Sequence, residues 1–258
     1  MRILRRLKPG TRGRHVLAWT ATVAVAAVGV AGCADTPGGQ QPTTGPTPTP
    51  AAPTTTPFNS TPASPVRRPA PNPTASAMAG GQKVIFFTFD DGPDPHWTPT
   101  VLQVLRRYGA HATFFEVGDM QSAHPGFSEQ VTAAGNTIGS HSVSHRILTT
   151  LPPGDLHHEV FDGPASTCFR PPDGATNPRV RAAIRAAGMV QVLWNIDPRD
   201  WARPGTPAIV HNILTHARPG AVILLHDGGG NRTQTIAALN QALPILKTRG
   251  YTFPPLNC

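Results

Sequence analysis

Asp90 and Asp91 are adjacent carboxylates at the end of an apolar run, residues 84–87, with Gly92-Pro93 directly after them. The run predicts a short buried strand. Two like charges this close resist joint ionisation unless a cation or a proton takes one of them. The pair therefore suggests chemistry, but it could equally cap a turn, where Asp-Gly and Gly-Pro are common. These residues alone leave both interpretations open.

His141 and His145 are a second pair that could do chemistry. Residues four apart lie on one face of a helical turn, so both imidazoles could bind one metal ion. The pattern is weak by itself, and exposed histidines are the alternative. Together with Asp91 the two histidines form a set that leaves coordination positions open for water and substrate. Such a set suits Zn²⁺ in a hydrolytic site, although Fe²⁺ and other divalent ions use it too.

Three further segments place ionisable residues after apolar runs. Arg170 opens the segment Arg-Pro-Pro-Asp-Gly, where a guanidinium could hold a carboxylate through two hydrogen bonds, or the segment could be a plain turn. Asp197 and Asp200-Trp201 follow the run 192–196, and His226-Asp227 follows the run 222–225. One polar strand end is ordinary, but several at the same end of one sheet predict a pocket.

Strand-like and helix-like segments alternate from residue 81 onward. Alternation of this kind predicts a parallel sheet, open or closed into a barrel, with the site at the carboxyl ends of its strands. The expected strands are 84–89, 112–117, 136–140, 189–196, 221–225 and 251–253, and the expected helices are 98–108, 127–134, 177–187, 207–217 and 233–248.

Taken together, the motifs resemble the polysaccharide deacetylases, the NodB-homology domains of carbohydrate esterase family 4. The resemblance covers residues 81–258 and implies an α/β fold, a distorted (β/α) barrel with fewer than eight regular strands. It also implies removal of acetyl groups from chitin, chito-oligosaccharides, peptidoglycan sugars or xylan. The motifs occur in the family's order: Thr-Phe-Asp90-Asp91-Gly-Pro, His141-x-x-x-His145, Arg170-x-Pro172-x-Gly174, Asp197-x-x-Asp200-Trp201 and Leu224-x-His226-Asp227.

The resemblance implies a role for each matching residue. Asp91, His141 and His145 would hold a divalent metal, with Zn²⁺ expected first and Co²⁺ as an alternative. Asp90 would be the general base and His226 the general acid that protonates the leaving group. An amide leaves badly unless its nitrogen is protonated, so the chemistry needs both.

Other matching residues would support that chemistry. Arg170 would orient Asp90, and Asp197 would keep His226 charged. Trp201 and Leu224 resemble the residues that form an apolar slot for the acetyl methyl group. Asp173 stands where the family commonly has an aromatic residue. It keeps the backbone N–H that is thought to help the oxyanion, but it adds negative charge near the metal.

The interval between His145 and Arg170 is short for the family, so one barrel element should be missing or curtailed.

Most of the net charge of +8 lies outside this catalytic region. Residues 1–80 contain eight of the 22 Lys and Arg residues and one of the 14 acidic residues. The high pI therefore does not indicate nucleic-acid binding, and we expect no nucleic-acid partner.

Residues 1–33 have a basic start, an apolar run over 16–31 and small residues before Cys33. This pattern predicts an export signal, and it resembles the bacterial lipoprotein signal in which that cysteine is acylated. Lipidated Cys33 would anchor the protein to the outer face of the plasma membrane. An uncleaved membrane anchor is the alternative, and a secreted form is another. Each places the remainder outside the cytoplasm.

Residues 34–80 are rich in Pro, Thr, Ala, Ser and Gly, and they predict a disordered tether. Residues 81–258 suffice for one domain, expected as a monomer. Cys168 and Cys258 are the two remaining cysteines of an exported chain, which favours a disulfide over two unpaired buried thiols.

The first hypothesis is an exported, metal-dependent deacetylase of N-acetylated sugars, with peptidoglycan or a chitin-like polymer as substrate. The anchor and tether favour peptidoglycan. An acetylxylan esterase, which removes O-acetyl groups, is the rival with the same chemistry. A catalytically silent wall-binding lipoprotein is the rival from another class.

Overall fold

The computed structural model describes residues 83–258. Six parallel strands form one sheet in the order β5-β4-β3-β2-β1-β6. The strands are β1 (Ile85–Asp90), β2 (Ala112–Glu116), β3 (Thr137–Ser140), β4 (Cys168–Phe169), β5 (Val190–Gln191) and β6 (Ala221–His226). The predictions for Cys33, the export signal and the tether lie outside the described residues.

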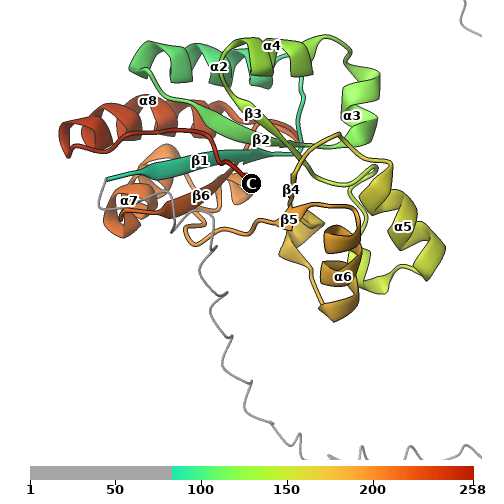
Figure 1. Ribbon diagram of the computed structural model, residues 1–258. Helices are drawn as coiled ribbons and strands as arrows, with labels where there is room; N and C mark the ends of the chain where they lie inside the picture. The colour runs from blue at the N-terminus through green and yellow to red at the C-terminus, as the bar shows by residue number, and fades with distance from the viewer. Residues whose placement is uncertain (1–82) are drawn as a thin grey trace, which may run out of the picture. The chain divides into compact units, whose positions relative to one another are not determined.

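Seven α-helices and three short 3₁₀ helices connect the described strands (Figure 1). The α-helices are α2 (Trp97–Tyr108), α3 (Gly118–Ala123), α4 (Phe127–Ala133), α5 (Pro153–Phe161), α6 (Pro178–Ala186), α7 (Thr206–His216) and α8 (Thr233–Thr248). The 3₁₀ helices are η1 (Leu148–Thr150), η2 (Pro172–Gly174) and η3 (Asp200–Ala202). The predicted alternation of strands and helices is confirmed.

One chain segment, residues 192–196, links the two edges of the sheet. The N–H of Val192 donates to the carbonyl of Phe169 in β4 at 2.8 Å. Four residues later, the carbonyl of Ile196 accepts from the N–H of Leu224 in β6 at 2.9 Å. The sheet is thereby curled into a distorted, incomplete barrel with fewer than eight strands, as predicted. The expected run 189–196 forms only the two-residue strand β5, and 251–253 contributes only a bridge from Thr252 to Val84.

The side chains of β1 alternate between two apolar layers, because successive strand residues point to opposite faces. Ile85, Phe87 and Phe89 pack outward in a cluster with buried residues of α2, α7 and α8. Phe86 packs in a separate, inner cluster. The residues two and four positions after Phe86 share its face, so Thr88 and Asp90 point into the barrel. The apolar pattern of β1 thus carries a carboxylate to the inner end of the strand.

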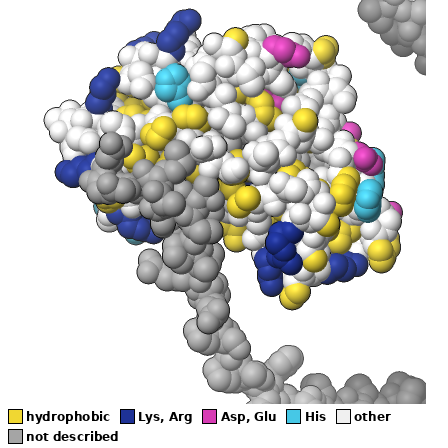
Figure 2. Space-filling model, in the orientation of Figure 1, with side chains coloured by type: hydrophobic (Ala, Val, Ile, Leu, Met, Phe, Trp, Pro, Cys, Tyr) yellow, Lys and Arg dark blue, Asp and Glu magenta, His cyan; other side chains and the backbone are white. Residues whose placement is uncertain are grey.

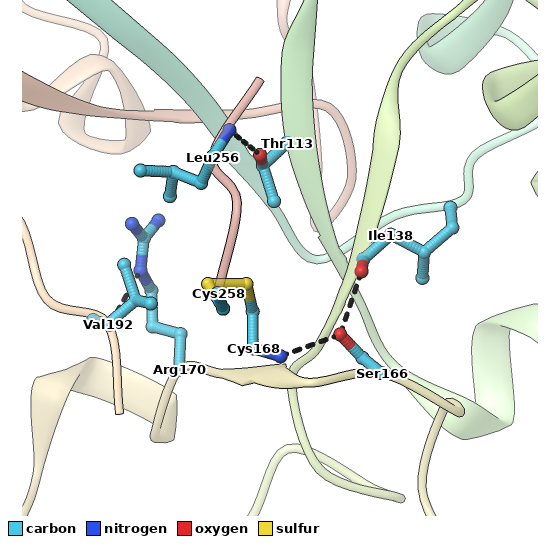
Figure 3. Close-up of a disulfide and its surroundings, with 8 residues drawn as sticks. All are labelled: Thr113, Ile138, Ser166, Cys168, Arg170, Val192, Leu256 and Cys258. Atoms are coloured by element: carbon cyan, nitrogen blue, oxygen red, sulfur yellow. Dashed lines mark hydrogen bonds between the residues drawn. A yellow bond between two sulfur atoms is a disulfide. The ribbon is translucent and has the colours of Figure 1, made fainter. Parts of the chain in front are cut away.

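The C-terminal tail belongs to the inner layer of the barrel (Figure 3). Cys258 is joined to Cys168 of β4 by a disulfide, and the N–H of Leu256 donates to Oγ1 of Thr113 at 2.9 Å. Leu256 packs with Phe86 and Val192 in the inner cluster. The disulfide therefore ties the end of the chain to the strand that leads into Arg170.

Apolar and basic side chains are distributed differently on the face that Figure 2 shows. Apolar side chains are scattered in small groups, whereas Lys and Arg side chains lie mostly near the margins. Among the described helices, none has the length and apolar character needed to cross a membrane.

Candidate active site

Asp90 is held at the end of β1 by Arg170. Nη1 of Arg170 donates to Oδ1 of Asp90 at 2.6 Å and to Oγ1 of Thr88 at 2.9 Å. Arg170 is fully buried and Asp90 is 3% exposed, so water screens this ion pair little. Nε of Arg170 also donates to the carbonyl of Val192 at 3.3 Å, which fixes the guanidinium from the other side of the barrel. The contact expected between Arg170 and Asp90 is present, and it commits one oxygen of Asp90.

Asp91 reaches the same cavity as Asp90 through an unusual backbone conformation. Its φ of 74° lies in the left-handed region, so the strand alternation is broken at this residue. A side chain at Gly228 would collide with the carbonyl of Asp91, so the loop after β6 can pack here only as glycine. The close packing of this loop keeps the second carboxylate turned toward the cavity.

Asp91, His141 and His145 each offer a ligand atom, and these atoms all lie within 4.8 Å of one another. Oδ1 of Asp91 is 3.6 Å from Nε2 of His141 and 3.2 Å from Nε2 of His145. Oδ1 is buried and has no hydrogen-bond partner among the described residues. An unpartnered carboxylate oxygen between two imidazole nitrogens fits a divalent cation.

The tautomer of His141 also suits a metal ligand. Its Nδ1 is 2.7 Å from the carbonyl of Arg170, which only accepts, so Nδ1 carries the proton and Nε2 presents a lone pair. Burial lowers the pKa of His141 and favours the neutral ring. Burial alone would raise the pKa of Asp91, but the close approach of His145 and the charges of His141 and His226 outweigh it and hold that pKa well below its usual value.

The turn between the two histidines differs from the expected helical turn. Ser142 and His145 have φ values of 69° and 61°, which a right-handed helix does not allow. Oγ of Ser142 accepts from the N–H of His145 at 3.0 Å. Oε2 of the buried Glu159, in α5, accepts from the N–H groups of Val143 and Ser144 at 3.1 and 2.9 Å. Glu159, which the sequence motifs did not indicate, thus holds the loop that carries both histidines.

His226 is held by Asp200, and the prediction that Asp197 does this is wrong. Nδ1 of His226 is 2.8 Å from Oδ1 of Asp200. Oδ2 of Asp200 accepts from the N–H of His226 at 3.0 Å and from Oγ1 of Thr235 at 2.7 Å. The carboxylate of Asp197 instead accepts from the N–H of Arg199 at 2.8 Å, closing a local turn. The left-handed conformation of Arg199 reverses the chain, so the later aspartate of the motif faces β6.

The contact with Asp200 changes the charge state of His226. Burial by itself lowers the pKa of His226, but the hydrogen bond and the charge of Asp200, with smaller contributions from Asp90 and Asp91, raise it above its usual value. Asp200 is 1% exposed, so its charge acts on the imidazole at low screening. The ring is therefore ready to donate a proton from Nε2 near neutral pH.

These groups surround one cavity of about 570 Å³ at the carboxyl ends of the strands. The cavity contains most of the predicted site residues, and Arg170 lies behind Asp90. Trp194, Gly229 and Arg232 line it as well, although the motifs did not indicate a role for them. The lining residues are Asp90, Asp91, His141, His145, Asp173, Trp194, Asp197, Trp201, Leu224, His226, Gly229 and Arg232.

Three lining residues bear on the predicted substrate contacts. Leu224 is 4% exposed, and Trp201 is 48% exposed at the mouth. Asp173 lies in η2 with a left-handed φ of 55° and an exposed side chain. The structure thus brings an apolar wall and an additional carboxylate to the cavity.

A distorted α/β barrel that brings three potential metal-ligand groups together with a separately held carboxylate and a separately held imidazole has the groups that a metal-assisted hydrolase needs. The sequence pattern of the family described as "Polysaccharide deacetylase" matches residues 77–192. The chain belongs to the polysaccharide deacetylase family.

Two relatives and one solved structure show the extent of the similarity. A peptidoglycan-N-acetylglucosamine deacetylase of Bacillus cereus is 42% identical over 186 residues, covering 68% of this chain and 87% of the relative. A chitooligosaccharide deacetylase of Bradyrhizobium is 36% identical over 197 residues, covering 68% and 90%. The structure of the peptidoglycan deacetylase PdaC from Bacillus subtilis has a TM-score of 0.62 and 33% identity, covering 67% of this chain and 88% of that one.

Proposed function

We propose that this protein is an N-deacetylase that hydrolyses the acetamide group of N-acetylglucosamine units in peptidoglycan. The observation that carries the proposal is that two groups able to transfer protons lie beside one potential metal site, and each is held by its own partner residue. Asp90 is held by Arg170, and His226 is held by Asp200. Relatives named for peptidoglycan and chitooligosaccharide deacetylation support an N-acetylated sugar as the substrate.

The proposed metal ligands are Asp91, His141 and His145. A divalent ion such as Zn²⁺ or Co²⁺, when bound there, supplies a Lewis acid that lowers the pKa of a water and polarises the acetyl carbonyl. The residues themselves fit this role, because one buried carboxylate oxygen and two imidazole nitrogens face one another. Metal dependence is therefore part of the proposal.

Asp90 is proposed as the general base. Arg170 occupies Oδ1, so Oδ2 is the oxygen that can accept a proton from the attacking water. Oδ2 lies 3.7 Å from Nε2 of His141, which places it next to the proposed metal ligands. As the water loses its proton to Asp90, its oxygen forms a bond to the acetyl carbon, and the π electrons of the carbonyl move onto the carbonyl oxygen.

His226 is proposed as the general acid. Asp200 engages Nδ1, so Nε2 is the nitrogen that can donate to the departing group. The carbonyl then re-forms, the carbon–nitrogen bond breaks, and His226 donates its proton to the nitrogen, which gives a neutral amine and acetic acid. The acetic acid ionises to acetate, and Asp90 and His226 return to their starting protonation states by exchange with solvent. Correctly matched protonation of such a pair contributes roughly 10²–10⁴-fold to the rate.

The acetyl group would lie against the apolar wall of the cavity. We propose that Leu224 and Trp201 contact the methyl group, since both line the cavity and one is nearly fully buried. The backbone N–H of Asp173 is proposed to contact the carbonyl oxygen as negative charge develops there. These contacts would leave the sugar ring at the open mouth.

An O-deacetylase such as an acetylxylan esterase is the second candidate, because the same metal site and base would serve it. An alkoxide leaves more readily than an amide nitrogen, so a strongly held acid favours the amide substrate. Release of acetate from acetylated chitin oligomers, peptidoglycan and acetylxylan, with Zn²⁺ or Co²⁺ supplied, distinguishes the candidates. Acetate from acetylxylan alone would replace the proposal with the esterase. If none of the three substrates releases acetate, the remaining hypothesis is a wall-binding protein without catalytic activity.

We also propose that the chain is exported and anchored through Cys33. The support is the sequence of residues 1–33 alone, with its basic start, apolar run and small residues before the cysteine. A tether of residues 34–80 would then give the domain reach from the membrane to the wall. The placement agrees with a polymer substrate outside the cytoplasm.

A further inference from the structure

Two arginines, one that lines the cavity and one that lies against a lining residue, have no role in the proposed reaction. Arg232 lines the cavity, and the guanidinium of Arg199 lies over the ring of Trp201, which also lines it. Arg170 pairs with Asp90, and Arg146 pairs with Asp155. Within the described part of the chain, no carboxylate oxygen lies within 4.0 Å of a nitrogen of Arg199 or Arg232. We call these two residues the arginine pair.

Arg232 is a buried cation, and one of its donor nitrogens has no partner among the described residues. It is 4% exposed, and it donates from Nε to the carbonyl of Gly228 at 2.7 Å and from Nη2 to that of Gly229 at 3.0 Å. Nη1 has no hydrogen-bond partner among the residues that the structure describes. Arg232 directly precedes the 16-residue helix α8, whose N-terminal end carries partial positive charge. A buried guanidinium without a counter-charge is costly, and a bound anion would lower that cost.

Arg232 lies beside the proposed metal ligands. A Cβ atom added at Gly229 would be 2.7 Å from Oδ2 of Asp91 and 3.3 Å from Nη2 of Arg232. The absence of a side chain at Gly229 therefore keeps the approach to both groups open. An anion that meets Arg232 would consequently lie next to the reacting centre.

Arg199 does not itself line the cavity, but it lies against Trp201, which does. Its guanidinium lies 5.0 Å from the ring centroid of Trp201, a stacking that restrains an otherwise exposed side chain. The intervening Asp200 accepts from Oγ1 of Thr235, one turn into α8. That hydrogen bond joins η3, which follows Arg199, to the start of α8, which follows Arg232.

We propose that the arginine pair binds a carboxylate on the sugar next to the one that loses its acetyl group. The preferred substrate is then an acidic N-acetylated glycan, and this inference rests on the proposed deacetylase function. The lactyl group of N-acetylmuramic acid supplies such a carboxylate on glycan units that carry no stem peptide, whereas chitin oligomers are neutral. Planar guanidinium groups match a carboxylate through paired hydrogen bonds.

Asp173 opposes this attraction. Its carboxylate lines the cavity from η2 and is the charge that stands where the family commonly has an aromatic residue. Since like charges repel, Asp173 should weaken binding of an acidic sugar. Neutralising Asp173 should therefore increase the preference for the acidic glycan, whereas neutralising either arginine should decrease it.

The test compares two tetrasaccharides of equal length with the metal-loaded protein. One alternates N-acetylglucosamine with N-acetylmuramic acid, and the other is chitotetraose. The measured quantity is the ratio of kcat/KM for acetate release from the acidic over the neutral compound. We expect a ratio above one for the unaltered protein. It should fall about tenfold in Arg232→Gln and about threefold in Arg199→Gln, and rise in Asp173→Asn.

Arg218→Gln is the matched control, because this exposed arginine precedes β6 at the end of the barrel opposite the site. It removes one positive charge and should leave the ratio unchanged. Higher NaCl should lower the ratio of the unaltered protein by screening the charges. Arg199→Gln alters an exposed side chain, so it decides the question even if Arg232→Gln fails to fold.

A ratio of one or below for the unaltered protein would overturn the inference, as would a ratio that neither arginine variant lowers. Either result leaves the deacetylase function standing. Should neither compound release acetate, the proposed function fails first. The ratio of the two Kd values, measured by calorimetry with the same variants, then decides the inference by the same criteria.

Discussion

At the residue scale, the assignment of His226 depends on which aspartate touches it. Asp200 contacts its Nδ1, and Asp197 contacts the chain near Arg199. The charge of Asp200 raises the pKa of His226 against the opposing effect of burial. A general acid must be protonated, so activity should be lost as pH rises through that pKa.

Asp200→Asn should therefore move the alkaline limb of the pH profile of kcat/KM to lower pH and reduce the maximum rate. The neutral amide cannot stabilise the imidazolium, and burial then acts unopposed by that charge. Asp197→Asn is the matched control and should leave the alkaline limb in place. A shift in the control with none in Asp200→Asn would reverse the roles given to these two residues.

Asp90 and Asp91 make the second contrast between neighbouring carboxylates. We expect Asp90→Asn to lower kcat by roughly 10²–10⁴-fold while metal remains bound, because the base is lost and the ligands are kept. Asp91→Asn should instead lose metal. Metal content after gel filtration, measured by atomic absorption, checks both. Loss of metal from Asp90→Asn would show that the division of work between the two is wrong.

The residue types of the site could be predicted, but their contacts could be predicted only in part. The alternation of β1 places Asp90 in the barrel, and it follows from the apolar pattern 84–87. The choice between Asp197 and Asp200 depends on a left-handed Arg199 and on Thr235 of a distant helix. The buried Arg232 next to Gly229 had no motif of its own. Contacts between residues far apart in sequence decide these details, and local spacing does not encode them.

At the scale of elements, loops rather than helices or strands position the two histidines of the proposed metal site. The expected helical turn from His141 to His145 is instead a loop with two left-handed residues. Its backbone N–H groups are satisfied by Glu159 of α5. The strands could be predicted because their apolar runs are continuous, whereas the loop conformation depends on a buried carboxylate from another element.

Glu159→Gln should weaken metal binding about tenfold, since partners that orient metal ligands commonly contribute that much to affinity. The amide can accept only at one atom, so the loop between the histidines loses part of its support. Competition with a chromophoric chelator gives the Kd for Zn²⁺. Glu129→Gln, an exposed change in α4, is the control. If the two variants bind Zn²⁺ with equal affinity, Glu159 does not support the loop that carries the histidines.

At the scale of the whole molecule, the disulfide links the end of the chain to the barrel interior. Cys168 and Cys258 are 90 residues apart in sequence, and Leu256 of the tail packs beside Phe86 and Val192. The bond lies two residues before Arg170, so it supports both the stability of the fold and the placement of the guanidinium.

Cys258→Ala should lower the free energy of unfolding by about 4 kcal/mol, from the entropy that a long closed loop removes from the unfolded chain. Urea denaturation at equilibrium measures the change. Reductant should destabilise the unaltered protein by a similar amount and leave the variant unaffected. A variant as stable as the unaltered protein would show that the disulfide contributes nothing to the fold.

Anchoring through Cys33 remains a proposal for the chain as a whole. Cys33→Ser should abolish incorporation of labelled fatty acid. The protein should then either accumulate as the uncleaved precursor or appear in the medium. Labelling that persists in this variant would contradict the anchor. Activity of the isolated catalytic region does not bear on this point, so the two proposals can fail separately.

The most direct test of the central claim measures acetate and new primary amines together, after the metal-loaded protein acts on peptidoglycan. N-deacetylation breaks one carbon–nitrogen bond for each acetate, so the account predicts equal amounts of acetate and amine, both abolished in Asp90→Asn. Acetate without a matching amine would show an esterase instead. If the protein has metal bound and forms neither acetate nor amine, the account is contradicted.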